Sequence, residues 1–168
     1  MRNYIIMGIA FLLISCSPSI SKIENNKIQI NETLDSWHKA AANSAFETYF
    51  SLMTPNGVFI GTDATENWQN EAFRTFSKPY FDKGKAWNFN SLQRNIYLNK
   101  SQNTAWFDEL LDTQMKICRG SGILIKVNGK WKIAHYVLSM TVPNEKTSEV
   151  VKIKDEIESV EISRLRTK

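Results

Sequence analysis

RGSGILIKVNGKWKIAHYVLSMTVP, residues Arg119 to Pro143, is the stretch that decides the fold of this chain. Its centre, Asn128-Gly129, stands between two runs rich in β-branched and other apolar residues. Asparagine and glycine tolerate positive φ, which the tight two-residue turn of a β-hairpin requires. The stretch therefore predicts two long antiparallel strands joined at Asn128-Gly129.

A two-residue turn also predicts which residues of the two strands face each other. Counted outward from the turn, the facing pairs are Val127 with Lys130, Leu124 with Ile133, Gly122 with His135 and Gly120 with Val137. One face of the sheet then carries Leu124, Trp131, Ile133 and His135. The other face carries Ile123, Ile125, Ala134, Tyr136 and Leu138.

The length and charge of the chain limit what it can be. It has 168 residues, of which 23% are charged, and a formal net charge of +4. This length suits one domain with a substantial core. The basic residues are scattered along the sequence among acidic ones, whereas a nucleic-acid surface needs clustered lysine and arginine. We therefore expect one domain and no nucleic-acid partner.

The first sixteen residues predict export from the cytoplasm. Arg2 precedes an apolar run from Tyr4 to Ile14, which is too short to span a bilayer as a helix but suits a signal-peptide core. The run leads into Leu13-Ile14-Ser15-Cys16, which resembles the lipobox of bacterial lipoproteins. The resemblance implies a signal peptide at 1–15, lipid on Cys16 and attachment to a membrane of the cell envelope, facing the periplasm. An ordinary secretory leader is the alternative.

The polar residues 16–29 predict a tether that holds the domain off the membrane. With Cys16 acylated, Cys118 is the only free thiol, and we expect it to be a small buried apolar residue. Only His38 and His135 supply imidazoles, so we expect no metal site. The sequence shows no phosphate-binding loop or serine-histidine-acid arrangement, and we expect no cofactor.

Apolar residues at helical spacing predict a helix from about residue 29, with Ile30, Leu34, Trp37 and Ala41 on one stripe. Two further helices are predicted from capping-box spacing, which pairs Ser44 with Glu47 and Asp63 with Glu66. Strands are predicted at 58–61, 87–99 and 104–111, and a marginal helix in the charged tail 145–168. In the strand 104–111, alternation places Trp106, Asp108 and Leu110 on one face, and Phe107, Glu109 and Leu111 on the other.

Five fragments in this order resemble the SnoaL-like branch of the nuclear transport factor 2-like superfamily, over residues 30–144. They are Trp37 to Ala41, Phe59 to Trp68, Ala105 to Glu109, Arg119 to Gly122 and Gly129 to Ala134. The resemblance implies a cone-shaped α+β fold, in which N-terminal helices pack on a curved antiparallel sheet and enclose a pocket. It also implies that His135 faces into the cone, where Gly120 and Gly122 leave volume for a cavity.

Enzymes of this fold commonly use a buried carboxylate or an Asp/His pair as a general base, so Asp108 and His135 are the catalytic candidates. Desolvation by aromatic walls would raise the pKa of such a carboxylate. The structural alternatives are that Asp108 pairs with Arg119, that His135 is a hydrogen-bonded core residue, and that Asp63 caps a helix. The expected pocket residues are Trp37, Tyr49, Phe59, Asp63, Glu66, Trp68, Trp106 and Arg119.

Two hypotheses for function follow. The first is a lipid-anchored pocket domain that binds a small, partly apolar ligand without turnover. The second is a cofactor-independent isomerase, dehydratase or hydrolase that uses Asp108 or His135. The apolar outer face of the sheet, with Ile123, Ile125 and Tyr136, suits a homodimer, unless the C-terminal helix covers it.

Overall fold

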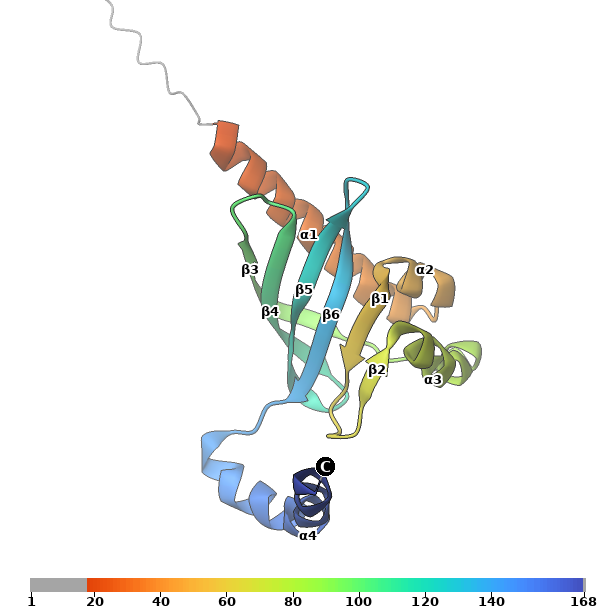
Figure 1. Cartoon of the computed structure of the whole chain (residues 1–168), viewed down its shortest axis with the longest axis vertical. Coiled ribbons are helices and arrows are strands. Elements are labelled where there is room, and N and C mark those ends of the chain that lie inside the picture. Colours follow the sequence, from red (N-terminus) through yellow and green to blue (C-terminus); the bar gives the residue numbers. More distant parts are fainter. Residues whose placement is uncertain (1–17, 168) are drawn as a thin grey trace, which may run out of the picture.

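The fold consists of helices followed by a sheet of long strands (Figure 1). The computed structural model describes residues 18–167, so the predicted signal peptide and Cys16 lie outside the described residues. The helices are α1 (Pro18–Ala42), α2 (Phe46–Ser51), α3 (Asn70–Asp82) and α4 (Thr147–Arg166), with the short 3-10 helix η1 (Asn144–Lys146) before α4. The strands are β1 (Met53–Ile60), β2 (Asn67–Gln69), β3 (Asn90–Leu98), β4 (Thr104–Thr113), β5 (Lys116–Val127) and β6 (Lys130–Met140).

The six strands form one curved, open sheet in the order β2-β1-β6-β5-β4-β3. Neighbouring strands are antiparallel except β1 and β6, which are parallel. The sheet is therefore mixed, whereas the prediction was an antiparallel sheet. Helix α1 lies across one face of the sheet, which we call the inner face (Figure 1). The predicted α+β class, with N-terminal helices on a curved sheet, is confirmed.

The hairpin at Asn128-Gly129 forms as predicted. Both turn residues have positive φ, 50° for Asn128 and 78° for Gly129. Near the turn the pairing also agrees with the prediction, since Val127 faces Lys130 and Leu124 faces Ile133. The turn chemistry thus fixes the first pairs of the ladder.

Beyond these pairs a β-bulge shifts the register. Leu124 faces Ile133, but the preceding residue, Ile123, faces His135, so that Ala134 is an extra residue on β6. One extra residue turns every later side chain of that strand to the opposite face, because side chains alternate with a period of two. The predicted register is therefore wrong for the part of β6 that follows Ala134.

The bulge exchanges the inner and outer residues of β6. Gly122 faces Tyr136 and Gly120 faces Leu138, so Tyr136 and Leu138 are buried on the inner face. His135 lies on the outer face and is half-buried. The space beside the glycines is occupied, because a Cβ at Gly120 would collide with the Tyr136 hydroxyl and one at Gly122 with the backbone oxygen of His135. The glycines therefore do not open a cavity.

Helix α1 is longer than predicted, because residues 18–29, which were expected to be part of a tether, form its first half. Asn26 explains the extension. It is buried, its amide donates to Gln102 Oε1 at 2.9 Å, and its oxygen accepts from Lys126 Nζ at 2.7 Å. These bonds attach the first half of α1 to the ends of the sheet strands. The predicted apolar stripe of its second half is buried as expected.

The core between the helices and the inner face is filled by aromatic rings. Trp37 stacks on Tyr49 with ring centroids 4.7 Å apart. Phe59 stacks on Phe73 at 4.2 Å and on Tyr136 at 5.6 Å. Such offset stacking stabilises a core beyond the burial of apolar area. The rings expected to line a pocket therefore pack against one another.

The charged tail forms α4, as its apolar spacing predicted. Figure 1 shows α4 extending away from the sheet beyond the end of β6. None of its side chains is buried, so α4 does not cover the outer face of the sheet in this structure. No helix within residues 18–167 combines the length and the apolar character needed to cross a bilayer.

Candidate functional site

The candidate site is a buried polar network centred on Glu109 of β4. Alternation along β4 places Glu109 on the inner face between Phe107 and Leu111, and only 1% of the residue is exposed. A carboxylate inside an apolar layer is costly unless hydrogen-bond donors surround it. Three side chains from different elements supply those donors.

His38 of α1 lies with its Nε2 2.9 Å from Glu109 Oε1. The hydroxyl of Tyr136 on β6 donates to the same oxygen at 3.1 Å. Arg94 of β3 donates from Nε to Glu109 Oε2 at 2.9 Å, and its Nη2 lies 2.8 Å from that oxygen. Both oxygens of the carboxylate therefore have partners, and one side chain joins α1 to three strands of the sheet.

These partners decide the charge of Glu109. Burial alone would raise its pKa, but the hydrogen bond and charge of His38 and the charge and hydrogen bonds of Arg94 outweigh it, and the pKa lies below its ordinary value. Burial and the negative charge of Glu109 raise the pKa of Tyr136. Glu109 is thus an ionised acceptor, and Tyr136 is a neutral donor.

Arg94 makes a second connection between the network and α1, in addition to that of His38. Only 6% of its side chain is exposed, and its Nη1 donates to Asn31 Oδ1 at 3.0 Å and to Asp35 Oδ1 at 2.8 Å. The guanidinium therefore pairs with one buried and one exposed carboxylate. A planar, permanently charged fork suits this arrangement better than a lysine would.

His38 is the residue of the network that could accept a proton or a hydrogen bond from a ligand. Because ionised Glu109 only accepts, Nε2 of His38 carries a hydrogen, and Nδ1 presents a lone pair whenever the ring is neutral. That Nδ1 is buried and has no hydrogen-bond partner among the described residues. Six buried side-chain polar atoms of the described residues lack a hydrogen-bond partner, and two of them, His38 Nδ1 and Arg94 Nη2, belong to this network. Of these two, only the histidine nitrogen can accept a proton, which suggests a ligand or a functional role.

A depression of about 380 Å³, open to solvent, lies beside this histidine. Its walls come from α1, from the segment before β3 and from the first two residues of β3. The lining residues are Asp35, His38, Lys39, Ala42, Asn88, Phe89, Asn90 and Ser91. The depression thus offers hydrogen-bonding groups around one buried imidazole.

A second, wider depression of about 620 Å³ lies between α3 and the loop that follows it. Its walls include the aromatic residues Phe76, Tyr80 and Trp87 together with Lys85 and Gln114. It is more apolar than the depression beside His38 and contains no residue of the Glu109 network.

The two residues proposed from the sequence as the catalytic base do not lie together on the inner face. Asp108 precedes Glu109 on β4, so it points to the outer face, where Asn95 donates to it at 3.0 Å. His135 lies on the outer face because of the bulge at Ala134. The expectation that His135 faces into the cone is wrong for this reason.

The expected pocket residues divide into three groups. Trp37, Tyr49 and Phe59 are buried in the aromatic core, while Trp68 is half-buried and stacks on Phe76 with ring centroids 4.8 Å apart. Trp106 is 48% exposed and Arg119 is exposed, both on the outer face. Asp63 and Glu66 belong to the turn between β1 and β2.

That turn explains why the predicted helix cap at Asp63 is wrong. Asp63 Oδ1 accepts from the backbone N of Thr65 at 2.8 Å and from its hydroxyl at 2.6 Å, and these bonds lower the pKa of Asp63. The carboxylate therefore stabilises a turn, as aspartate often does. Helix α3 begins only at Asn70. The predicted cap at Ser44 is also wrong, since Ser44 has a φ of 52° and α2 has no side-chain cap.

Sequence reasoning missed Arg94 and Tyr136 as site residues. It included His38 and Glu109 only as members of fragments that resemble the SnoaL-like branch, without giving either a role. One signal was available for Glu109, because the alternation of β4 places an ionisable residue on the same face as Phe107 and Leu111. Among the described residues, no group of histidine, cysteine, aspartate and glutamate side chains has the arrangement of a metal site.

Solved structures with a similar fold come from several bacteria. A candidate dehydratase of the NTF2-like family from Streptomyces avermitilis matches with a TM-score of 0.62 and 11% identity, covering 72% of this chain and 99% of that one. A candidate scytalone dehydratase from Novosphingobium aromaticivorans matches with a TM-score of 0.61 and 10% identity, covering 73% and 89%. An NTF2-like protein of unknown function from Pseudomonas putida matches with a TM-score of 0.58 and 12% identity, covering 76% and 92%.

At these identities the likeness shows the fold alone. No curated protein matches the chain in sequence. The family model of the SnoaL-like domain matches residues 30–143, which include the whole sheet, the second half of α1 and all four residues of the Glu109 network. This chain therefore belongs to the SnoaL-like domain family.

Proposed function

We propose that this chain is a cofactor-independent acid–base enzyme, an isomerase or dehydratase, whose proton acceptor is His38. The observation that carries the proposal is the Nδ1 of a buried histidine, which has no partner within residues 18–167, while the other ring nitrogen is held by ionised Glu109. His38 takes the role that the sequence suggested for Asp108 or His135, since those two lie on the outer face.

The chemistry follows from the network. A neutral imidazole is a suitable general base near pH 7. When Nδ1 takes a proton from the substrate, the carboxylate of Glu109 stabilises the imidazolium and keeps the ring in one orientation. Arg94 and Tyr136 in turn keep the carboxylate ionised and fixed. In this assignment Glu109 is a positioning residue and His38 is the catalytic one.

The walls of the depression suggest the substrate class. Lys39, Asn88 and Asn90 would donate hydrogen bonds to a carbonyl oxygen on the substrate. Removal of a proton from a carbon next to a carbonyl is a first step shared by double-bond isomerisation and by dehydration of a β-hydroxy carbonyl compound. We therefore expect a small carbonyl compound with few charged groups.

Exchange of substrate hydrogen for solvent deuterium tests this proposal without knowledge of the natural substrate. A panel of small ketones, enones and β-hydroxy carbonyl compounds is incubated with the protein in D₂O and followed by NMR. We expect exchange into at least one compound and a loss of about 10²- to 10⁴-fold in His38→Gln. The matched control is His135→Gln, which changes the other histidine and should leave exchange unchanged. Equal exchange in the two variants would remove His38 from the reaction.

A second candidate function is binding of a partly apolar ligand without turnover. The aromatic depression bordered by Phe76, Tyr80 and Trp87 favours it. Because the core rings pack on one another, a ligand site for this function would lie in that depression and not inside a cone. A ligand that quenches tryptophan fluorescence in the parent chain but not in Trp87→Leu would support it.

We further propose that the protein is attached to a membrane of the cell envelope, facing the periplasm, through lipid on Cys16. The apolar run before Cys16 and its lipobox-like end support this. Mass spectrometry of the protein isolated from membranes tests it, since acylation adds the mass of the fatty chains to an N-terminal Cys16. An unmodified N-terminus elsewhere would refute it.

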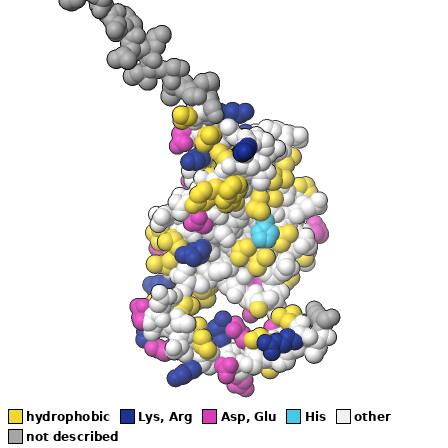
Figure 2. All heavy atoms as spheres, turned by 60° about the vertical axis from the view of Figure 1, so that its left-hand side comes forward, with side chains coloured by type: hydrophobic (Ala, Val, Ile, Leu, Met, Phe, Trp, Pro, Cys, Tyr) yellow, Lys and Arg dark blue, Asp and Glu magenta, His cyan; other side chains and the backbone are white. Residues whose placement is uncertain are grey.

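A homodimer through the outer face of the sheet is also a proposal. The bulge changes the residues that support it, because Tyr136 and Leu138 are inside. Exposed apolar residues on the outer face include Tyr97, Trp106, Ile117 and Ile123. Figure 2 shows apolar side chains in patches among polar ones over the body of the domain. Analytical ultracentrifugation of Trp106→Lys, compared with the parent chain, tests this interface.

A further inference from the structure

Three segments that are distant in the sequence meet at one end of the molecule. They are the first turns of α1 (18–27), the turn between β3 and β4 (99–103) and the turn between β5 and β6 (126–130). The bonds of buried Asn26 to Gln102 and Lys126 hold them together, and the backbone N of Lys126 donates to Asn103 O at 2.8 Å. We call this surface the lysine end.

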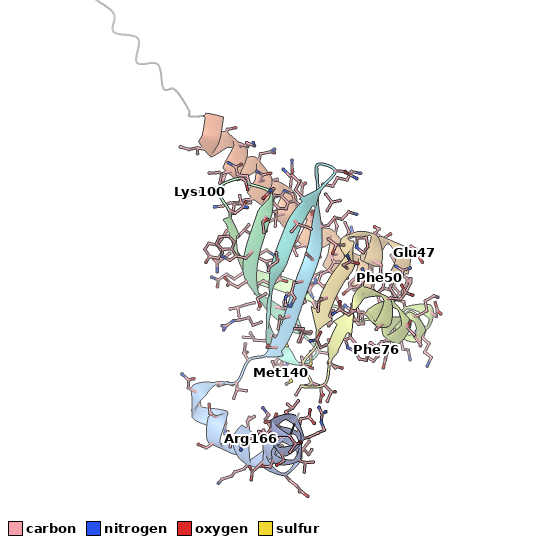
Figure 3. All side chains as sticks on the ribbon, viewed as in Figure 1. Glu47, Phe50, Phe76, Lys100, Met140 and Arg166 are labelled. Carbon is pink, nitrogen blue, oxygen red and sulfur yellow. The ribbon has the colours of Figure 1, made fainter. Side chains whose placement is uncertain are left out.

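The lysine end gathers positive charge that looks scattered in the sequence. Its charged residues are five lysines and one acid, namely Lys22, Lys27, Lys100, Lys126, Lys130 and Glu24. In the rest of the described chain the acids outnumber the basic residues, 16 to 14. Figure 3 shows Lys100 at this end, and Arg166 of α4 at the opposite end. Net positive charge is therefore concentrated at one end of the long axis of the molecule, and the rest of the described chain carries a small net negative charge.

Apolar side chains accompany the lysines. Ile20 on the first turns of α1 is 63% exposed, and Val127 beside the hairpin turn is 37% exposed. Lysines around a few exposed apolar residues form the pattern that proteins use at the headgroup region of a bilayer, where apolar tips enter the interface and lysines approach anionic lipids. Figure 2 shows basic and apolar side chains, with some acidic ones, together at the end of the domain where α1 begins.

The chain also enters the domain at this end. Helix α1 begins at Pro18, two residues after Cys16, and two residues span at most about 7 Å. Because residues 18–29 are helical and bonded to the sheet ends, they cannot act as a flexible spacer. A lipid on Cys16 would therefore hold the lysine end against the membrane surface.

We propose that the lysine end is a docking surface for an anionic phospholipid bilayer. This inference rests on the proposed lipid anchor, which supplies proximity, while the lysines and Ile20 fix the orientation. The long axis then points away from the bilayer, with the lysine end at the headgroups and α4 at the distal end (Figure 1). Each lysine near such a surface adds about fivefold to the partition between docked and undocked states at low salt.

Site-specific fluorescence on the anchored full-length protein tests the orientation. An environment-sensitive probe is attached to Val127→Cys, at the lysine end, or to Ser163→Cys, on α4. Native Cys118 is fully buried, so it does not react in the folded protein. The protein is reconstituted in phosphatidylcholine vesicles with or without about a third phosphatidylglycerol, and headgroup-level quenching lipids report contact.

We expect quenching of the probe at residue 127, more strongly in the anionic vesicles and reversed by high salt, and little quenching at residue 163. Lys22→Glu with Lys130→Glu should reduce docking at least tenfold, whereas the matched pair Lys152→Glu with Lys154→Glu on α4 should not change it. Equal quenching at the two probe positions, or equal effects of the two charge-reversal pairs, would overturn the proposal.

The failure of the anchor and the failure of the surface can be told apart. If mass spectrometry shows Cys16 without lipid, the anchor proposal fails. The same probes are then followed as the protein is added to preformed vesicles. Salt-sensitive binding of the lysine end to anionic vesicles would still support the docking surface, and absence of such binding would refute it.

Discussion

Replacement of Glu109 by glutamine is the most direct test of the buried network. Glutamine keeps the shape of the side chain but removes the charge, so that Arg94 and His38 lose the carboxylate that they share, and one of its two acceptor oxygens is replaced by a donating NH2 group. Removal of one partner from a buried ion pair typically costs about 3–5 kcal/mol, because the other charge stays buried without compensation. Asp35 still pairs with Arg94, and its side chain is 64% exposed, so we expect the lower part of this range, about 3 kcal/mol.

Urea denaturation followed by tryptophan fluorescence measures this loss. The matched control is Asp108→Asn, the neighbouring carboxylate on the opposite face of the same strand, whose partner is Asn95. We expect the control to lose less than about 1 kcal/mol, as is usual for exposed polar pairs. A loss below about 1 kcal/mol in Glu109→Gln, or equal losses in both variants, would refute the view that Glu109 is an ionised, paired carboxylate.

The dependence on pH gives a second measure of the same residue. The pKa of Glu109 is lower in the folded protein than its ordinary value of 4.5, so the folded state holds the carboxylate charged where the unfolded state begins to bind a proton. Its contribution is therefore present above about pH 4.5 and is lost as the pH falls through the folded pKa. The stability of Glu109→Gln should change less over this acid range than that of the parent chain. Equal acid sensitivity would contradict the assignment.

Three further predictions use residues around the network. Tyr136→Phe removes the hydroxyl that donates to Glu109 and should cost about 1–2 kcal/mol in urea denaturation, since Glu109 keeps its other donors. Gly122→Ala should lose about 1–3 kcal/mol, because its new methyl group would strike the backbone of His135, and an unchanged melting curve would contradict this close approach. Cys118 should react with a thiol reagent only at the rate of unfolding, which is measured by labelling as a function of urea concentration.

The sequence predicted what depends on local chemistry. The turn at Asn128-Gly129, the apolar stripe of α1 and the alternation of β4 each follow from a few adjacent residues and were correct. The β4 alternation grouped Phe107, Glu109 and Leu111 correctly on one face, but the opposite face, with Trp106 and Asp108, was expected to line the pocket. What misled the choice of site was the assumption that Asp108, and not its neighbour, was the buried carboxylate.

The remaining errors depend on contacts between distant segments. The bulge at Ala134 cannot be seen in β6 alone, because no proline or glycine marks it. The helical state of residues 18–29 depends on Asn26, whose partners lie 76 and 100 residues further along the chain. Arg94 and Tyr136 join the site only because sheet order brings β3, β4 and β6 beneath α1. The helix and strand propensities of residues carry no information about contacts with such distant parts of the chain.

The bulge at Ala134 also affects how relatives of this chain should be compared. A relative that lacks this one residue would align with β6 across a single gap and would look almost unchanged. If the gap were set one residue away, every later column of the strand would match inward residues with outward ones, and Tyr136 would be compared with a solvent-facing position. The effect of a substitution inferred from such an alignment would then be assigned to a buried position where the residue faces solvent, or the reverse, throughout the part of β6 that follows the bulge. Alignments of this family are therefore best anchored on the pairing of β5 with β6, because hydrogen-bonded partners keep their correspondence where residue counts do not.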